Sequence, residues 1–229
     1  MTTFGLADKL RRTKRSFQLS MIRHDFYPDR WVRSEYAREV KEWEARGRAA
    51  PVPSVQKQRI VREYASRFRL SVLVETGTYF GAMVEACKDT FEKIYTIELQ
   101  EAFCRRAQKR FARFPHIRVL EGDSAIALEA VLGGISERCL FWLDAHYMGG
   151  ISAKGESACP AMQDLETIAS HPVPGHVVLI DDARLFQGRG GWPSLAAVSE
   201  FAAAHGWAGD VRDDIIRLTP DADNCRGAR

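Results

Sequence analysis

The sequence predicts an α/β domain with a seven-stranded, mostly parallel sheet and helices on both faces, preceded by a helical extension. Three observations lead to this fold class. From residue 71 onward, short β-branched apolar runs alternate with amphipathic stretches, the pattern of successive βα units. A glycine-containing turn, Glu75 to Gly81, separates the first run from a helix. An acidic residue follows each of the first five runs. The 229 residues are enough to bury the core of such a domain.

Composition narrows the classes of protein that fit. No run of about 18 apolar residues occurs, so we expect no transmembrane helix. The first residues lack the apolar core of a signal peptide. The five cysteines form neither a CxxC pair nor a metal-ligand spacing. A reducing cytoplasm is therefore the expected location.

Basic residues gather in the first third of the chain. Residues 1–70 carry 17 Lys and Arg against 8 Asp and Glu, a balance of +9, whereas residues 71–229 carry 16 against 22, a balance of −6. A solvated helical face is one explanation, and a basic rim that meets an anionic substrate or a membrane surface is the other. No nucleic-acid-binding motif accompanies the charge, so we expect no nucleic acid partner.

Residues 1–53 are predicted to form a basic, aromatic, helical extension. Within it, residues 33–47 should be a helix, because Tyr36, Val40 and Trp43 fall on one face. A stiff proline-containing linker follows this helix. The aromatic residues offer either a face that docks on the domain or a contact for a homodimer.

The main domain is predicted over residues 54–219. Ser54 should cap a first helix that leads directly into the sheet. The expected helices are 55–68, 79–90, 99–114, 124–132, 160–169 and 193–204. The expected strands are 71–75, 93–98, 117–120, 139–143 and 176–180. A terminal hairpin over 208–219, turning at Asp213-Asp214, completes the sheet, and residues 220–229 form a tail.

The turn after the first strand reads Glu75-Thr-Gly77-Thr-Tyr-Phe-Gly81. It lacks the third glycine of a dinucleotide fingerprint and the lysine of a P-loop. An acid at the end of the strand would repel a pyrophosphate but attract a sulfonium or ammonium group. The turn therefore favours a cofactor with a positive centre, and the alternative is a turn that only packs the strand against the helix.

This turn resembles motif I of the class I S-adenosylmethionine (SAM) dependent methyltransferases, which have a Rossmann-like fold. The resemblance implies that SAM is the cofactor and that the turn binds it through Glu75, Thr76, Gly77, Thr78, Tyr79 and Gly81.

The same resemblance implies that Glu98 accepts hydrogen bonds from the ribose hydroxyls and that Asp123 and Ser124 lie at the adenine amine. Two alternatives stay open. Glu98 could be an exposed acid that starts the next helix, and Asp123 could cap the helix that follows it.

Three carboxylates form a further group, because Asp144 follows the fourth strand and Asp181-Asp182 follow the fifth. They make a hard oxygen site suited to Mg²⁺ or another hard divalent cation, without which their repulsion would be costly. The group resembles the cation-dependent O-methyltransferases of the catechol and macrolide-sugar type. In that family the ion chelates two adjacent substrate oxygens. The alternative is that Asp182 caps the next segment while Asp144 binds SAM or substrate without a metal.

Methyl transfer to oxygen also needs a base near the acceptor hydroxyl. His146, two residues after Asp144, is the first candidate because the ordinary pKa of histidine lies near neutrality. Lys154, in the same loop, is the second candidate, since the resemblance to the catechol-type enzymes implies a lysine base in this loop.

The sequence thus predicts a SAM-dependent methyltransferase that uses Asp144, His146 or Lys154 in metal-assisted O-methylation. The expected acceptor is a hydroxylated small molecule or a sugar. One alternative is a metal-independent methyltransferase acting on nitrogen or a peptide. The other is a non-catalytic scaffold that keeps the fold and docks partners through its basic N-terminal region.

Overall fold

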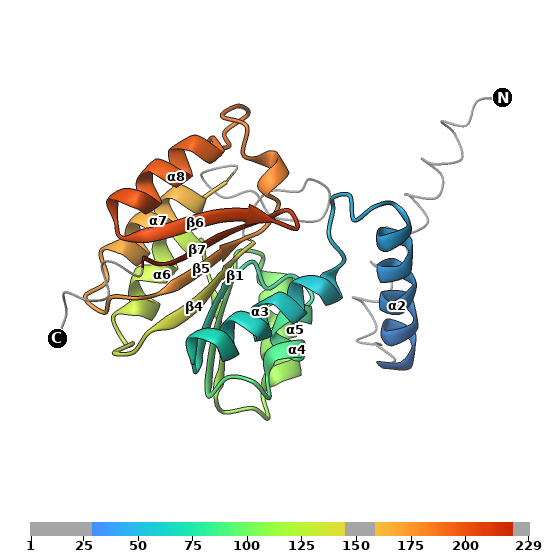
Figure 1. Cartoon of the computed structure of the whole chain (residues 1–229). Helices are drawn as coiled ribbons and strands as arrows, with labels where there is room; N and C mark the ends of the chain where they lie inside the picture. The colour runs from blue at the N-terminus through green and yellow to red at the C-terminus, as the bar shows by residue number, and fades with distance from the viewer. Residues whose placement is uncertain (1–28, 145–158, 222–229) are drawn as a thin grey trace. The chain divides into compact units, whose positions relative to one another are not determined.

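The computed structural model describes the backbone of residues 29–144 and 159–221, and side chains from residue 37 onward within those ranges. The chain divides into two compact units, Met1–Arg46 and Gly47–Arg229. The first unit contains helix α2 (Asp29–Ala45), which overlaps the helix predicted over 33–47 (Figure 1).

The second unit contains the predicted sheet and its helices. The strands are β1 (Val72–Thr76), β2 (Lys93–Glu98), β3 (Ile117–Glu121), β4 (Cys139–Leu143), β5 (Val177–Ile180), β6 (Trp207–Arg212) and β7 (Ile215–Pro220). The helices are α3 (Ser54–Phe68), α4 (Ala82–Cys87), α5 (Glu101–Phe111), α6 (Ser124–Leu132), α7 (Ala161–Ala169), the short 3₁₀ helix η1 (Ala183–Leu185) and α8 (Leu195–Ala204).

The seven strands form one sheet in the order β3-β2-β1-β4-β5-β7-β6. Strands β1 to β5 are parallel, and β7 pairs antiparallel with both β5 and β6. The turn between β6 and β7 contains Asp213 and Asp214, whose φ angles of 51° and 56° are those of a tight hairpin turn. The predicted fold class is therefore confirmed, including the terminal hairpin.

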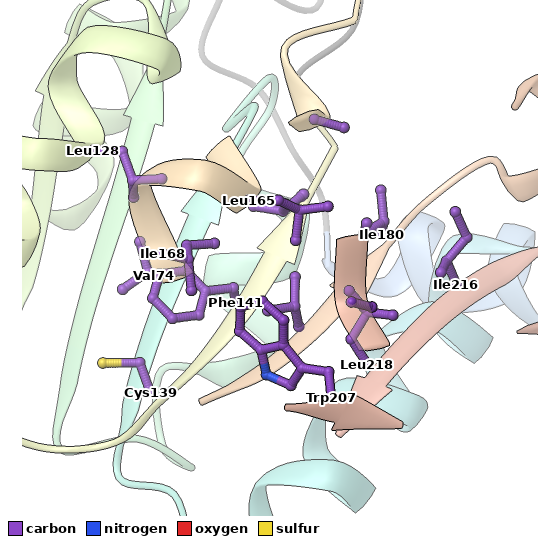
Figure 2. Close-up of a cluster of buried hydrophobic side chains, with 14 of the residues drawn as sticks. Val74, Leu128, Cys139, Phe141, Leu165, Ile168, Ile180, Trp207, Ile216 and Leu218 are labelled. Carbon is purple, nitrogen blue, oxygen red and sulfur yellow. The ribbon is translucent and has the colours of Figure 1, made fainter. Parts of the chain in front are cut away.

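Helices cover both faces of the sheet (Figure 1), and the strands from β1 to β5 contribute side chains to both cores. In β4, Phe141 packs with α6, α7 and α8 on one face, while Leu140 and Trp142 pack with α3, α4 and α5 on the other. Figure 2 shows the first of these clusters, with Phe141, Leu165 and Ile180 among its members. Burial on both faces explains why the strands read as continuous apolar runs.

Helices α4 and α5 differ most from their predicted lengths, since each is several residues shorter, while the bounds of the other predicted helices of the domain agree within two residues. The predicted helix over 79–90 begins only at Ala82, because Tyr79 and Gly81 have φ angles of 49° and 71°, which an α-helix cannot contain. The helix predicted over 99–114 spans Glu101–Phe111. The residues missing at the start of each helix belong to the turns at the ends of β1 and β2, and both helices also end about three residues earlier than predicted.

Helix α3 places its first turn at the carboxyl ends of the strands. It ends at Arg69, whose left-handed conformation (φ 54°) reverses the chain into β1. Since α3 therefore runs back along β1, its N-terminal turn lies at the edge where β1 ends. The helix also packs against β4 and β5, and this position becomes important for Lys57. Within the described ranges, no helix is long and apolar enough to cross a membrane.

Candidate active site at the carboxyl ends of the strands

Four acidic side chains are buried where the parallel strands end. Glu75, Glu98, Asp181 and Asp182 expose only 2%, 7%, 2% and 4% of their surface. Asp144, at the end of β4, is half-buried. A buried carboxylate must have hydrogen-bond or charge partners, since desolvation of an isolated charge is very costly. The partners of each acid therefore show what the site is built to do.

The turn between β1 and α4 has a fixed shape. The N–H groups of Gly77 and Thr78 both donate to the carbonyl oxygen of Ile97 in β2, at 2.9 and 3.3 Å. Gly77, Tyr79 and Gly81 all have positive φ angles. A Cβ added to Gly81 would lie 2.8 Å from the ring of Phe111 in α5, so only glycine fits there without a shift of the core. The turn is thus held by both the neighbouring strand and the next helix.

A chain of three side chains lies behind this turn. The hydroxyl of Thr96 in β2 donates to the Glu75 carboxylate at 2.5 Å, so the Thr78 hydroxyl, also 2.5 Å from Thr96 Oγ1, is the donor to Thr96. Burial raises the pKa of Glu75 to about 8, while the hydrogen bond from Thr96 opposes this shift. Thr96 is not among the site residues predicted from the sequence. The feature of the sequence that could have pointed to Thr96 is a polar residue in an otherwise apolar strand, between Ile94 and Glu98.

Glu98 closes the other side of the turn. Its Oε2 accepts the backbone N–H of Tyr79 at 2.7 Å, and its Oε1 accepts that of Gln100 at 2.9 Å. Each oxygen keeps a lone pair for a further donor. Burial raises the pKa of Glu98, and the backbone hydrogen bonds oppose this. Beside it, Gln100 Oε1 is buried without a hydrogen-bond partner in the described part of the chain. This acceptor set fits a ligand that presents two hydroxyl groups.

The segment after β3 forms a helix cap and a buried polar group. Asp123 caps α6 by accepting the N–H of Ala125 at 3.1 Å. The Ser124 hydroxyl donates to Oδ2 of Asp164 in α7 at 3.3 Å. Asp164 is only 1% exposed, and burial raises its pKa to about 7 against the hydrogen bond from Ser124. The Ser124 hydroxyl is thus already engaged inside the protein.

Asp164 is a further candidate for the site, and it is not among the residues predicted from the sequence. Its Oδ1 has no hydrogen-bond partner among the described residues, and the nearby Thr76 hydroxyl forms no hydrogen bond of normal geometry with it. Asp164 and Asp181 also line a small cavity with room for about one water molecule. The remaining walls are apolar: Leu143, Cys159, Ala161, Ile180, Phe186 and Trp192. The feature of the sequence that could have pointed to Asp164 is an acidic residue beside the apolar stripe of the helix that begins at Ala161.

The two acids after β5 each face a basic side chain. The Lys57 ammonium forms an ion pair with Asp181 and lies 3.9 Å from Asp182. Arg184 Nη1 lies 2.6 Å from Asp182 Oδ1 and also pairs with Asp214 in the hairpin turn. Burial disfavours the charge on Lys57, but the carboxylates around it, first Asp181 and then Asp144, raise its pKa overall. Asp181 and Asp182 are therefore each accompanied by a basic side chain that balances their charge.

This arrangement bears on the predicted metal ligands Asp144, Asp181 and Asp182. Their oxygens are of the hard type that Mg²⁺ prefers. However, a divalent ion bound between Asp181 and Asp182 would have to displace the ammonium of Lys57, so the set does not fit a metal in this arrangement. Within the described ranges, no group of three His, Cys, Asp or Glu side chains is placed to hold a metal ion. The predicted bases His146 and Lys154 lie outside the described residues.

The comparisons with known proteins agree with the fold. No family model and no curated relative matches the sequence. An O-methyltransferase from Bacillus cereus in complex with SAH superposes with a TM-score of 0.55 at 14% identity, over 82% of this chain and 91% of that one. The O-methyltransferase TomG from Streptomyces achromogenes, in complex with SAM, gives 0.54 at 16% identity, over 82% and 88%.

A SAH-bound methyltransferase from Podospora anserina, PaMTH1, gives a TM-score of 0.51 at 17% identity, over 80% of this chain and 87% of that one. Sequence identities this low carry the fold and not the substrate. The chain therefore has the class I SAM-dependent methyltransferase fold, and its candidate site lies at the edge where such open sheets bind ligands.

Proposed function

We propose that this protein is a SAM-dependent O-methyltransferase that acts on a hydroxylated small molecule. The observation that carries the proposal is Glu98. It is a buried carboxylate at the end of β2, fixed by the N–H groups of Tyr79 and Gln100, with acceptor capacity left over. In this fold, it stands where a ribose with two adjacent hydroxyls can be recognised.

The residues around the first turn would hold the cofactor. The turn from Gly77 to Gly81 provides a rigid, close-fitting backbone, and Glu98 together with Gln100 Oε1 offers acceptors for the ribose. Glu75 lies behind the turn, hydrogen-bonded to Thr96. Because burial raises its pKa to about 8, it is largely uncharged at neutral pH, and its proposed part is to hold the turn rather than to attract the sulfonium by charge. When bound, SAM supplies an electrophilic methyl group. Binding and orientation are the contributions of this chain's own residues.

The acceptor would lie beyond β4 and β5. Two structural neighbours, TomG and the Bacillus cereus protein, are named O-methyltransferases, which favours oxygen over nitrogen as the accepting atom. We assign the removal of the acceptor proton to His146, with Lys154 as the second candidate, because both follow Asp144 within ten residues in the sequence. A sugar or another polyhydroxylated compound is the proposed acceptor.

The proposed methyl transfer uses no divalent ion. The carboxylates that would hold it, Asp181 and Asp182, are paired with Lys57 and Arg184. The proton on the acceptor hydroxyl is instead removed by a protein base, and the acceptor oxygen attacks the methyl group in line with the departing sulfur.

Calorimetric titration with S-adenosylhomocysteine, with NAD as the control ligand, tests the cofactor. We expect micromolar binding of the first and none of the second. Glu98→Ala should weaken binding roughly 10- to 100-fold, because hydrogen bonds to a charged group contribute about 1.5–3 kcal/mol. Glu121→Ala is the matched control, since Glu121 is the exposed acid paired in register with Glu98 on β3.

Methyl transfer to a panel of hydroxylated small molecules and sugars tests the reaction. Transfer from labelled SAM to an oxygen atom is the expected result. Absence of S-adenosylhomocysteine binding would refute the proposed function and favour a scaffold that has kept only the fold. Transfer to nitrogen alone would favour the N-methyltransferase reading.

A further inference from the structure

We propose that Lys57 is the resident cation of this site: its ammonium takes the place of the divalent ion that the three carboxylates suggest, so that the site excludes divalent metals. Lys57 is a positioning residue, which holds the carboxylates after β4 and β5 in one arrangement. The metal-free methyl transfer that follows rests on the proposed function, whereas the exclusion of divalent ions can be measured without it.

Helix α3 is built to deliver this side chain. Lys57 lies on the inward stripe of the helix with Val61 and Tyr64, at i+4 and i+7, both of which are buried. Arg59 and Arg62, on the outer side of the same helix, are exposed. Lysine is rarely buried unless it is paired. Its place on the core-facing stripe therefore indicates a specific partner and not a solvated surface charge.

The first turn of α3 is also fixed in place. The side-chain amide of Gln58 donates to the carbonyl oxygen of Ala82, the first residue of α4, at 3.2 Å. This contact ties the start of α3 to the helix that follows the glycine turn. Lys57 therefore enters the site from a rigid element rather than from a loop.

The burial of the partners makes a cation necessary. The side chain of Asp181 is 1% exposed and that of Asp182 is 6% exposed, while that of Lys57 is 15% exposed. Two adjacent carboxylates withdrawn from water repel one another strongly in a medium of low dielectric constant. Lys57 Nζ contacts Asp181 and lies 3.9 Å from Asp182, so one ammonium screens both.

A second cation, Arg184, pairs with Asp182 and so opposes the binding of a metal ion shared by Asp181 and Asp182. Arg184 Nη1 binds Asp182 Oδ1 at 2.6 Å, and the backbone N–H of Arg184 donates to Asp214 Oδ1 at 2.8 Å. Asp214 therefore anchors Arg184 from the β6–β7 turn. A divalent ion would need to free both carboxylates, and so break two ion pairs that belong to different elements of the fold.

Binding of Mn²⁺, followed by its electron paramagnetic resonance signal, tests the proposal directly. Wild-type protein should leave Mn²⁺ in solution at millimolar concentration. Lys57→Met keeps the length of the side chain but removes its charge, so it should bind one Mn²⁺ at least about 10-fold more tightly than wild type. Arg59→Met, on the exposed side of the same helix, should behave as wild type. In Lys57→Met/Asp181→Asn the gained site should be lost.

Two outcomes would overturn the proposal. One is stoichiometric Mn²⁺ binding by the wild-type protein that Asp181→Asn abolishes. Another is a folded Lys57→Met variant, with S-adenosylhomocysteine affinity intact, that gains no Mn²⁺ binding. If Lys57→Met fails to fold, the wild-type titration still decides, and Lys57→Arg, which keeps the charge, should fold and exclude Mn²⁺.

The catalytic consequence has its own measurement. Methyl transfer by wild-type protein should continue undiminished in excess chelator, and a strict requirement for added Mg²⁺ would contradict it. Failure of the proposed function is separately visible. A protein that binds no S-adenosylhomocysteine refutes the methyltransferase assignment, while the Mn²⁺ comparison between wild type and Lys57→Met still decides the role of Lys57.

Discussion

Gly81 lies so close to Phe111 that a Cβ on the glycine would stand 2.8 Å from the far edge of the ring. Phe111, the last residue of α5, is 2% exposed and belongs to the same core cluster as Met83, Val84 and Ala107, so its ring cannot move aside freely. The contact locks the glycine turn onto α5. The geometry of the candidate cofactor site therefore depends on a packing contact as well as on backbone conformation.

Gly81→Ala should destabilise the protein more than Gly190→Ala. Both glycines have a positive φ, 71° and 65°, so both substitutions carry the same backbone strain. A Cβ at Gly190 would meet nothing within 4 Å. The difference between the two, about 1–3 kcal/mol for overpacking, is the cost of the clash with Phe111. Denaturant unfolding of the two variants measures it, and equal stabilities would show that the ring yields.

Asp164 should make stability fall as the pH rises. Its pKa is raised from 3.8 to about 7, so the folded protein favours the protonated acid. The stabilisation is complete below the unfolded pKa and is lost as the pH rises from about 4 through 7. Asp164→Asn imitates the protonated form and should remove this slope. Melting temperatures between pH 4 and pH 8 check it, with Asp210→Asn, an exposed acid on β6, as the control.

His176 should act in the opposite direction. The N–H of Cys139 donates to His176 Nδ1 at 3.0 Å, which leaves the proton on Nε2, where it is donated to His171 Nδ1, also at 3.0 Å. Burial disfavours the charged imidazolium and lowers the pKa of His176 to about 4, and electrostatic repulsion from His171 and Arg138 adds to this shift. Stability should therefore be lost as the pH falls from 6.5 through 4.

The matched comparison is His176→Gln against the exposed His205→Gln. The first should be less stable at neutral pH but should show a smaller loss on acidification, whereas the second should follow wild type. Because the contributions of Asp164 and His176 overlap in pH and oppose each other, only differences between each variant and wild type separate them. A wild-type acid slope in His176→Gln would assign acid sensitivity to other groups.

His146→Ala should lower kcat by about 100-fold or more if His146 removes the acceptor proton, and should flatten the pH–rate profile near neutrality. Lys154→Ala provides the comparison. If His146 is the base, the Lys154→Ala variant should keep the wild-type pH dependence of kcat near neutrality. An unchanged profile in His146→Ala would pass the role to Lys154. Binding of S-adenosylhomocysteine should stay the same in both variants.

The periodic features of the sequence predicted most of the fold. The apolar runs gave the five parallel strands, and the acids at their ends do converge because parallel strands end on one edge of the sheet. The predicted start of α4 was wrong because Tyr79 is left-handed and donates its N–H to Glu98, a contact between the turn after β1 and the end of β2. Local propensity does not contain that contact.

The counter-charges of the site were missed for a similar reason. Lys57 and Asp181 are 124 positions apart, and their ion pair exists only once α3 has folded back over the ends of β4 and β5. From the sequence alone, three carboxylates at neighbouring strand ends suggested a metal. Asp164 likewise looked like an ordinary helical acid, and only the packing of α7 against α6 brings it to Ser124.

The position of β7 in the sheet has a consequence for folding during synthesis on the ribosome. It is the last strand in chain order, yet it lies between β5 and β6. While a ribosome is still making residues 215–220, the nascent chain holds β5 with one edge open, and Val178, Leu179 and Ile180 of that strand are all destined for burial. An open apolar edge invites pairing with other chains. Final closure of the sheet must therefore wait until β7 has left the ribosome, and chaperones that cover strand edges should matter most in that interval.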